Sequence, residues 1–348
     1  MKTRTAAYAF AAASLLAGCV KDPVSALREV PIPSARGVYV INQGNFGRAN
    51  SSLSYYDLES FHVYNDVFTA VNGKNLGDVA QGMTIRGGSG YIVVNNSQKI
   101  EIIDLATNLN TGTIPTGSGS SPVTMAFVND SLALVTDQYA NDLIVVNVVS
   151  RTVVGTVPVG ANPQGIAIAA GKAYVANSGF GANNTVSVIS LGSLAVTRTI
   201  TVSDYPNDVE VTPSGAVYVV CAGAWDYADP SKDTPARIFV IDPLTDRVAD
   251  SIFIGEHAME IAVGADGIGY CLSTTRVLRV DTRANTVTGV FRDGSYFAVG
   301  VESSSGDVYL ADAKNYVQPG TVSVTAPNGQ LRVQFDVGII PGAFAFKR

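Results

Sequence analysis

One strand-like motif recurs seven times along this sequence, and no other feature limits the fold as strongly. The copies are Gly37–Asn42, Gly90–Asn95, Ser131–Thr136, Lys172–Asn177, Ala216–Cys221, Ile268–Ser273 and Asp307–Asp312. They recur at intervals of roughly 40–53 residues, which fits propeller blades rather than leucine-rich or helical repeats. The sequence therefore predicts a ring of repeated small sheets.

Further strands accompany each copy of the motif. In the fourth repeat, Ile166 and Ile168 lie in a leading strand, and Thr185–Ser190 and Val196–Val202 form a third and a fourth strand. Alternation of apolar and polar residues marks strands that are buried on one face only. Four such strands per repeat predict an antiparallel blade.

The two ends of the chain predict how the ring closes. The first copy of the motif has no leading strand, whereas Pro341–Phe346 resembles the leading strand Pro163–Ile168 and has no motif after it. The last strand should therefore enter the first blade, which leaves no open sheet edge. The predicted fold is an all-β, seven-bladed β-propeller of four-stranded antiparallel blades, formed as one domain by residues 37–348.

Composition agrees with this fold class and excludes some partners. Of the 348 residues, 47% are hydrophobic, 15% are charged and 34 are glycine, a mixture that favours strands and tight turns. The net charge of −6 and the absence of a basic stripe argue against nucleic-acid binding. No stretch after residue 20 is long and apolar enough to span a bilayer.

The N-terminus has the pattern of a targeting signal. Lys2 and Arg4 precede a short apolar segment, and the sequence Leu-Ala-Gly-Cys at 16–19 resembles the bacterial lipobox. The resemblance implies a signal peptide over 1–19, a lipidated Cys19 and a tether over 20–36, with Val20 favouring the outer membrane. The expected location is the cell surface, and a periplasm-facing lipoprotein remains an alternative. A chance cysteine in an ordinary signal peptide is the alternative interpretation of Cys19.

Cys221 and Cys271 are the cysteines that would remain after such processing. They occupy non-equivalent positions of successive repeats, inside apolar strand-like runs. Two cysteines outside the cytoplasm could pair. Their positions favour buried free thiols.

The connections predict two unlike faces. On one face the turns are short hairpin turns, as at Ala170-Gly171, and the turn aspartates there should accept hydrogen bonds from backbone groups. On the other face the loops carry aromatic and amide side chains, which glycines such as Gly47 help to fold back. The ligand-binding candidates on that face are Asn45, Phe46, Tyr139, Phe180, Asn183, Trp225, Tyr227 and Tyr316. A single aromatic residue there can equally fill a gap between blades, but the set favours a binding surface.

Carboxylates in the inner strands are a second candidate feature. If Val209 packs between blades, Asp208, Glu210 and Glu260 face the central channel, where other blades place glycine or alanine. They could hold a cation or transfer a proton. A water-filled channel with solvated acids is the alternative.

The sequence gives little support for catalysis. It lacks a G-x-S-x-G elbow and contains two histidines, which excludes a three-histidine zinc site. His62 falls in the outer part of the first repeat, while His257 begins a connection on the loop-rich face. A metal-assisted lyase or lactonase using His257 and Glu260 is the enzymatic alternative. No enzyme activity and no cofactor are expected.

The run Tyr174-Val-Ala-Asn177, followed by Asn184–Ile189, resembles the YVTN (YncE-like) propeller family. The stretch at 39–57, with Leu76–Met83 and Lys99–Thr107, is similar to Bacteroidetes surface lipoproteins that include the cobalamin-binding BtuG. This resemblance implies capture of a nutrient such as a corrinoid for a TonB-dependent outer-membrane receptor. An envelope scaffold without a small ligand is the alternative.

Overall fold

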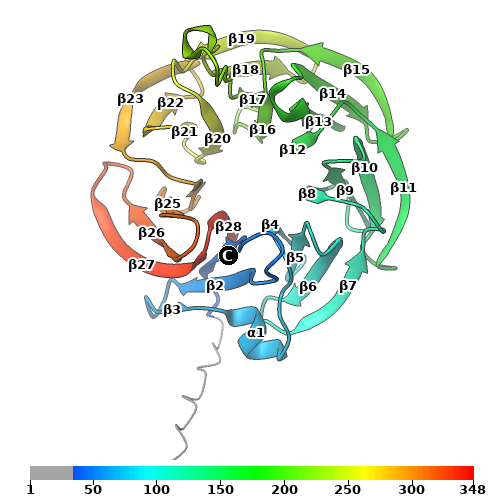
Figure 1. Cartoon of the computed structure of the whole chain (residues 1–348), viewed down its shortest axis with the longest axis vertical. Helices are drawn as coiled ribbons and strands as arrows, with labels where there is room; N and C mark the ends of the chain where they lie inside the picture. The colour runs from blue at the N-terminus through cyan, green and yellow to red at the C-terminus, as the bar shows by residue number, and fades with distance from the viewer. Residues whose placement is uncertain (1–33) are drawn as a thin grey trace, which may run out of the picture.

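The computed structural model describes residues 34–348 and shows seven four-stranded antiparallel sheets arranged around a central axis (Figure 1). From the axis outward, the first blade contains β28 (Pro341–Lys347), β1 (Gly37–Asn42), β2 (Ser52–Asp57) and β3 (Val63–Tyr64). The second contains β4 (Ala80–Arg86), β5 (Ser89–Val94), β6 (Lys99–Asp104) and β7 (Asn110–Pro115). The third contains β8 (Pro122–Phe127), β9 (Leu132–Asp137), β10 (Asp142–Asn147) and β11 (Thr152–Pro158).

The remaining four blades follow the same order from the axis outward. The fourth contains β12 (Pro163–Ala169), β13 (Lys172–Asn177), β14 (Thr185–Ser190) and β15 (Ala195–Thr201). The fifth contains β16 (Pro206–Val211), β17 (Val217–Cys221), β18 (Arg237–Asp242) and β19 (Arg247–Phe253). The sixth contains β20 (Ala258–Val263), β21 (Ile268–Ser273), β22 (Arg276–Asp281) and β23 (Thr286–Asp293). The seventh contains β24 (Ala298–Val301), β25 (Val308–Asp312), β26 (Pro319–Thr325) and β27 (Leu331–Ile339).

The ring closes through the C-terminal strand, as the sequence predicts. Strand β28 pairs antiparallel with β1, in a register that runs from Gly37 opposite Lys347 to Asn42 opposite Pro341. The first blade therefore combines strands from the two ends of the fold. Its innermost strand, β28, is the last strand of the sequence. In Figure 1 the red end of the chain lies inside the blue first blade.

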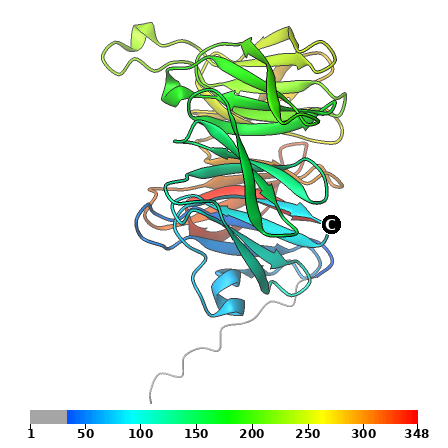
Figure 2. The ribbon, with the colours of Figure 1, turned by 90° about the vertical axis from the view of Figure 1, so that its right-hand side faces the viewer.

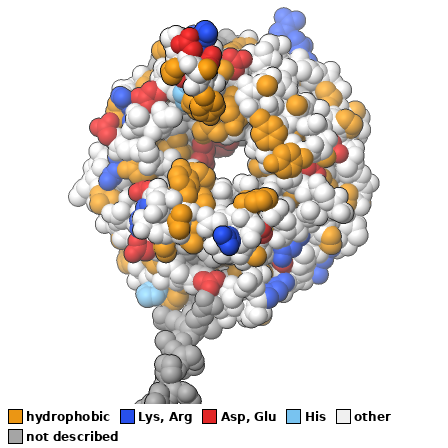
Figure 3. Space-filling view, viewed as in Figure 1, with side chains coloured by type: hydrophobic (Ala, Val, Ile, Leu, Met, Phe, Trp, Pro, Cys, Tyr) orange, Lys and Arg blue, Asp and Glu red, His pale blue; other side chains and the backbone are white. Residues whose placement is uncertain are grey.

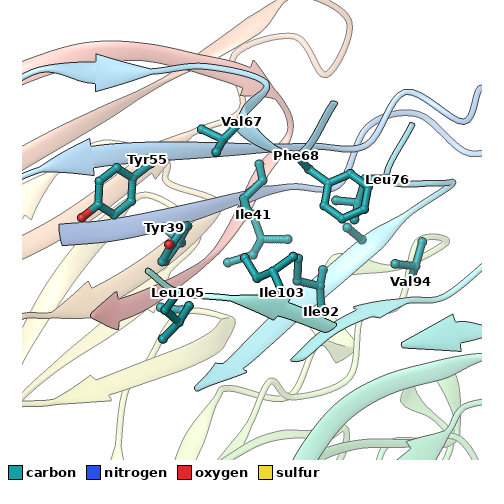
Figure 4. Close-up of a cluster of buried hydrophobic side chains, with 13 residues drawn as sticks. Tyr39, Ile41, Tyr55, Val67, Phe68, Leu76, Ile92, Val94, Ile103 and Leu105 are labelled. Atoms are coloured by element: carbon teal, nitrogen blue, oxygen red, sulfur yellow. The ribbon is translucent and has the colours of Figure 1, made fainter. Parts of the chain in front are cut away.

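Apolar side chains from neighbouring blades pack against one another. Figure 4 shows the cluster between the first two blades, where Tyr39 and Ile41 of β1 meet Ile92 and Val94 of β5. The repeated tyrosine of the strand motif also bridges blades. The Tyr39 hydroxyl donates to Asn108 Oδ1 at 2.6 Å in the outermost turn of the next blade.

The same bridge recurs in later blades, where Tyr174 donates to Asp246 and Tyr218 to Asn285. The three acceptor residues share a left-handed backbone at the turn before the outer strand. Burial raises the pKa of the Tyr218 hydroxyl to about 12, so it remains a donor at neutral pH. In these three blades the tyrosine of the sequence motif thus links one blade to the next.

The first blade departs from the regular pattern. Its outer strand β3 has two residues, and a short helix, α1 (Val67–Asn72), follows it and buries Val67 and Phe68 against the first core cluster. The sequence reasoning did not predict this helix. Within residues 34–348, no helix has the length and apolar character required to cross a bilayer.

The two cysteines of the described residues are free and buried. Cys221 lies in the cluster between the fourth and fifth blades, and Cys271 in the cluster between the fifth and sixth. Burial raises the pKa of the Cys221 thiol to about 12, which keeps it protonated and unreactive. Cys19 and most of the expected tether lie outside the described residues.

Candidate functional site

The two faces of the disc differ as the loop lengths predict. On one face the turns are short, and Asp57, Asp104 and Asp281 each accept backbone N–H groups two or three residues ahead. Opposite lie the long loops, which include η1 (Gly179–Gly181) and η2 (Pro230–Lys232). Figure 2 shows the loop around η2 extending to the left of the disc. We call this side the loop face and the other the turn face.

The loop face surrounds a cavity of about 790 Å³ on the propeller axis. Figure 3 looks into it: hydrophobic side chains gather around a central hole, and acidic groups lie on its wall. All seven blades contribute lining residues, from Gly342 of the first blade to Phe297 at the start of the seventh. Such convergence on one concave site is typical of small-molecule binding.

Two of the eight predicted ligand-binding residues, Phe180 and Tyr316, line this cavity. The other six surround it on the loop face: Asn45, Phe46, Tyr139, Asn183, Trp225 and Tyr227. Tyr205, Tyr296 and Phe297 of the inner connections also line it. Sequence reasoning missed other lining residues, and a signal for them was present, because each directly follows the first residue of an inner strand: Gln81, Asn207 and Met259.

Phe46 and Trp225 lie at the same rim of the cavity, because each is linked to a lining residue. The side-chain amide of Asn45, next to Phe46, donates to the Tyr316 carbonyl at 2.7 Å, and Tyr316 lines the cavity. On the opposite side, Trp225 stacks on His257, another lining residue, with ring centroids 3.8 Å apart. The aromatic loops predicted to share a face do share it.

Three lining aromatics have an unusual backbone conformation. The φ angles are +55° at Phe180, +57° at Tyr205 and +62° at Tyr316, in the left-handed region that bulky residues rarely occupy. Such strain persists where the surroundings fix it, and it is concentrated at binding and catalytic sites. Here the Tyr205 N–H donates to the Asn183 carbonyl at 3.0 Å, so one loop fixes the next. The cavity wall is preorganised.

Phe46 is held at the rim by polar contacts of its neighbours. The Gly47 N–H donates to the Asp78 carboxylate at 2.9 Å, and the Asn45 N–H donates to Asn50 Oδ1 at 2.8 Å. Gly47 has a φ of +75°, which a glycine adopts without strain. The loop therefore folds back while the Phe46 side chain remains 77% exposed.

Two of the channel carboxylates lie on the cavity wall where β16 and β20 meet. Asp208 Oδ2 accepts the Ile261 N–H at 3.0 Å, and Glu260 Oε2 accepts the Val299 N–H at 3.3 Å. Each acid thus contacts the inner strand of the following blade. Val209 is buried between blades, which turns its neighbours Asp208 and Glu210 away from the core, as predicted.

Burial raises the pKa values of all three channel acids. The value is about 6 for Asp208 and about 8 for Glu210, whose carboxyl is also opposed by the Asp208 charge. For Glu260 burial and the same charge raise the pKa well above its usual value. Glu210 therefore retains its proton near neutral pH, whereas Asp208 is largely ionised at pH 7.

The structure gives no support to a metal site built from Asp208, Glu210 and Glu260. Within residues 34–348, no group of three or more His, Cys, Asp or Glu side chains is arranged to hold a metal ion. The enzymatic alternative that uses His257 and Glu260 stays a prediction.

His257 supports the longest loop. Its Nδ1 donates to the Ala222 carbonyl at 2.8 Å, and its Nε2 lies 3.3 Å from Asp233 Oδ2, while the ring stacks on Trp225. Both nitrogens donate at once only when the ring is protonated. The contacts assign His257 a positioning role for the loop that carries Trp225 and Tyr227.

Replacing His257 with Ala should release this loop and expose Trp225 to water. We expect a red-shifted tryptophan emission and a loss of about 1–2 kcal/mol of stability, because one buried hydrogen bond and a ring stack disappear. Fluorescence and thermal denaturation measure both effects, since Trp225 is the one tryptophan. The control His62→Ala should leave the emission unchanged. An unshifted spectrum in His257→Ala would contradict the positioning role.

A family model described as a domain of unknown function, DUF5074, matches residues 36–225. Solved structures show the same fold at low identity. Hydrazine synthase from Kuenenia stuttgartiensis has a TM-score of 0.62 at 18% identity, over 76% of this chain and 88% of that one. A quinonprotein alcohol dehydrogenase-like protein from Bacteroides thetaiotaomicron has a TM-score of 0.70 at 16% identity, over 90% of this chain and 79% of that one.

A functionally unknown protein from Desulfotomaculum acetoxidans has a TM-score of 0.68 at 13% identity, over 89% of this chain and 98% of that one. At these identities the likeness shows a shared fold and carries no activity. No curated protein matches the sequence. Because the family model covers more than half of the 348 residues, the chain belongs to the DUF5074 family.

Proposed function

We propose that this protein is a surface lipoprotein that binds a small nutrient, cobalamin or a related corrinoid, on its loop face and delivers it to a TonB-dependent outer-membrane transporter. The observation that carries the proposal is the preorganised cavity of about 790 Å³, to which every blade contributes. A rigid site loses little conformational entropy when a ligand binds. The lipobox-like sequence before Cys19 and the resemblance to corrinoid-binding surface lipoproteins supply the ligand class and the location.

The direction in which the chain enters the ring is consistent with anchoring. The Ser34 carbonyl accepts the Lys347 ammonium at 2.6 Å, so the chain enters on the turn face, where β28 ends. A lipid on Cys19 would therefore pull on the face opposite the cavity. The attachment would leave the loop face free to meet the transporter.

Aromatic residues outside the cavity supply the contact with the transporter in this proposal. Phe46 and Tyr227 are 77% and 93% exposed and do not line the cavity. Exposed aromatics around a concave site are typical of protein interfaces. The same residues are the observation that favours an envelope scaffold as the second candidate function.

The proposal predicts that the chain from residue 20 onward binds cyanocobalamin at micromolar concentration or tighter. Isothermal titration calorimetry measures the binding, and Trp225 fluorescence reports it independently. Phe180→Ala should weaken binding about tenfold, because a lining aromatic is lost. The matched control is Phe61→Ala, since Phe61 is 71% exposed on the turn face and should not affect binding. Absence of heat and of a fluorescence change at micromolar ligand would overturn the corrinoid proposal.

A further inference from the structure

Six of the seven innermost strands contain a β-bulge at the end that meets the loop face. In β4, for example, Ala80 pairs with Val94 and Gly82 with Val93, so Gln81 has no partner. The bulges leave these residues unpaired: Gln81, Val123 and Thr124, Gln164 and Gly165, Asn207, Met259, and Gly342. In β24 the pairing with β25 is regular. The bulge is thus a repeated device at equivalent positions.

Every residue left unpaired by these bulges lines the cavity. A bulge adds one residue and redirects a side chain, and bulges are frequent next to active sites. Repetition around the axis turns six separate bulges into one ring, which we call the bulge ring. Outside the bulges, most inner strands supply small residues near the axis, as at Gly82 and Ala343. The bulge ring therefore determines what a ligand meets at the cavity mouth.

The chemistry of the bulge ring changes around the axis. The second, fourth and fifth blades place amides there, namely Gln81, Gln164 and Asn207. The sixth blade places Met259, and the seventh, which has no bulge, supplies Tyr296 and Phe297 beside it. One side of the cavity mouth therefore offers hydrogen bonds and the other offers apolar surface.

The three amides retain free hydrogen-bonding groups. The Gln164 side-chain NH₂ donates to Asn162 Oδ1 at 2.9 Å, and that of Asn207 donates to the Met259 carbonyl at 2.9 Å. The carbonyl oxygens of both side chains are left to accept from a ligand. Gln81 Oε1 faces the Gln43 amide at 3.5 Å, which leaves the Gln81 NH₂ to donate. A ligand edge with both donors and acceptors satisfies all three.

The charge of the lining excludes one ligand class. Among the described lining residues, the ionisable acids and bases other than tyrosine are Asp208, Glu260 and His257, and there is no lysine or arginine. An anion in this cavity would lose its hydration without a paired cation in the wall, which is unfavourable. Carboxylate and phosphate ligands are therefore disfavoured.

We propose that the bulge ring selects a ligand that carries no negative charge and has a hydrogen-bonding edge and an apolar face. The polar edge lies over the second, fourth and fifth blades, and the apolar face lies against Met259, Tyr296 and Phe297. This inference rests on the proposed function, because it names the ligand class and orientation for the same cavity. It does not depend on the ligand being a corrinoid.

A matched pair of small probes tests the charge and polarity of the site. N-acetylphenylalaninamide is uncharged, whereas N-acetylphenylalanine has the same body and a carboxylate. Ligand-observed NMR titrations at pH 7 should show binding of the amide at least ten times tighter than that of the acid. Gln164→Leu and Asn207→Leu should each weaken amide binding about fivefold, the effect of one hydrogen bond. Gln330→Leu, an exposed site on the turn face, is the control and should leave binding unchanged.

A gain of function separates selection by charge from a general loss of binding. Met259→Lys places a cation in the bulge ring and should strengthen binding of the acid at least tenfold. Equal binding of both probes, no binding of either, or an unchanged preference in Met259→Lys would overturn the proposal. A protein that ignores cyanocobalamin yet prefers the amide probe would instead overturn the corrinoid ligand and support the bulge ring.

Discussion

Deletion of residues 341–348 is expected to abolish folding of the whole propeller. The segment forms β28, which supplies the innermost strand of the first blade and pairs with β1 along its entire length. Phe344 and Phe346 also pack against Tyr309 of the seventh blade, with ring centroids 5.8 and 5.4 Å apart. Without the strand, β1 presents an unpaired edge and the seventh blade loses its neighbour. The fall in melting temperature should exceed about 20 °C, if any transition remains.

Circular dichroism and size-exclusion chromatography measure the loss of folding. Two milder variants show how much each part of the segment contributes. Deletion of Arg348 alone removes an exposed residue beyond the strand and should leave the melting temperature unchanged. Phe346→Ala keeps the strand and should remove about 3 kcal/mol through lost packing. A truncated chain that melts within a few degrees of the intact chain would show that the other six blades form a stable open ring. The closure argument would then be wrong.

Much of the fold could be predicted because the same local pattern is repeated. The motif around Tyr174 is a short, mainly apolar run typical of a buried strand, and its residues Ala173–Asn177 are buried. Seven copies remove the ambiguity of any single one. The fragment at Pro341 could be assigned because it matches Pro163–Ile168. Helix α1 could not be predicted, since its burial of Val67 and Phe68 substitutes for an outer strand that the other blades possess. A non-repeated element gives no second copy for comparison.

The site was harder to predict than the ring. Loop aromatics were correctly assigned to one face, but exposure alone does not tell a cavity wall from a rim, so Phe180 lines the cavity while Tyr227 does not. Gln164 was expected to hydrogen-bond a polar ligand, and it lines the cavity. Other side chains of the bulge ring, such as Gln81 and Met259, were missed because a bulge interrupts the alternation from which side-chain direction is inferred. Asn207 follows Pro206 as Gln164 follows Pro163, and aligning the inner strands at these positions would have revealed the series.

The channel acids predict that stability falls as pH rises. Asp208 and Glu210 have folded pKa values of about 6 and about 8, above their usual values in an unfolded chain near 4. The folded state therefore binds more protons than the unfolded state between about pH 4 and pH 8, and stability declines across that window. Carboxylates with lowered pKa, such as Glu101, are ionised in both states above about pH 5 and do not oppose this trend.

Glu210→Gln should therefore raise the melting temperature at pH 8.5 by about 3–6 °C and have little effect at pH 5, because the amide never acquires the charge that the channel disfavours. Asp208→Asn should raise the melting temperature at pH 8.5 by less, because the ionised Asp208 carboxylate is stabilised by the Ile261 N–H that donates to its Oδ2. Differential scanning calorimetry at both pH values measures the difference between each variant and the parent, which cancels contributions common to both chains. Glu59→Gln, at an exposed position on the turn face, is the control and should show no pH-dependent gain. An equal gain at both pH values would mean that packing, and not the buried charge at the channel, determines the effect of Glu210.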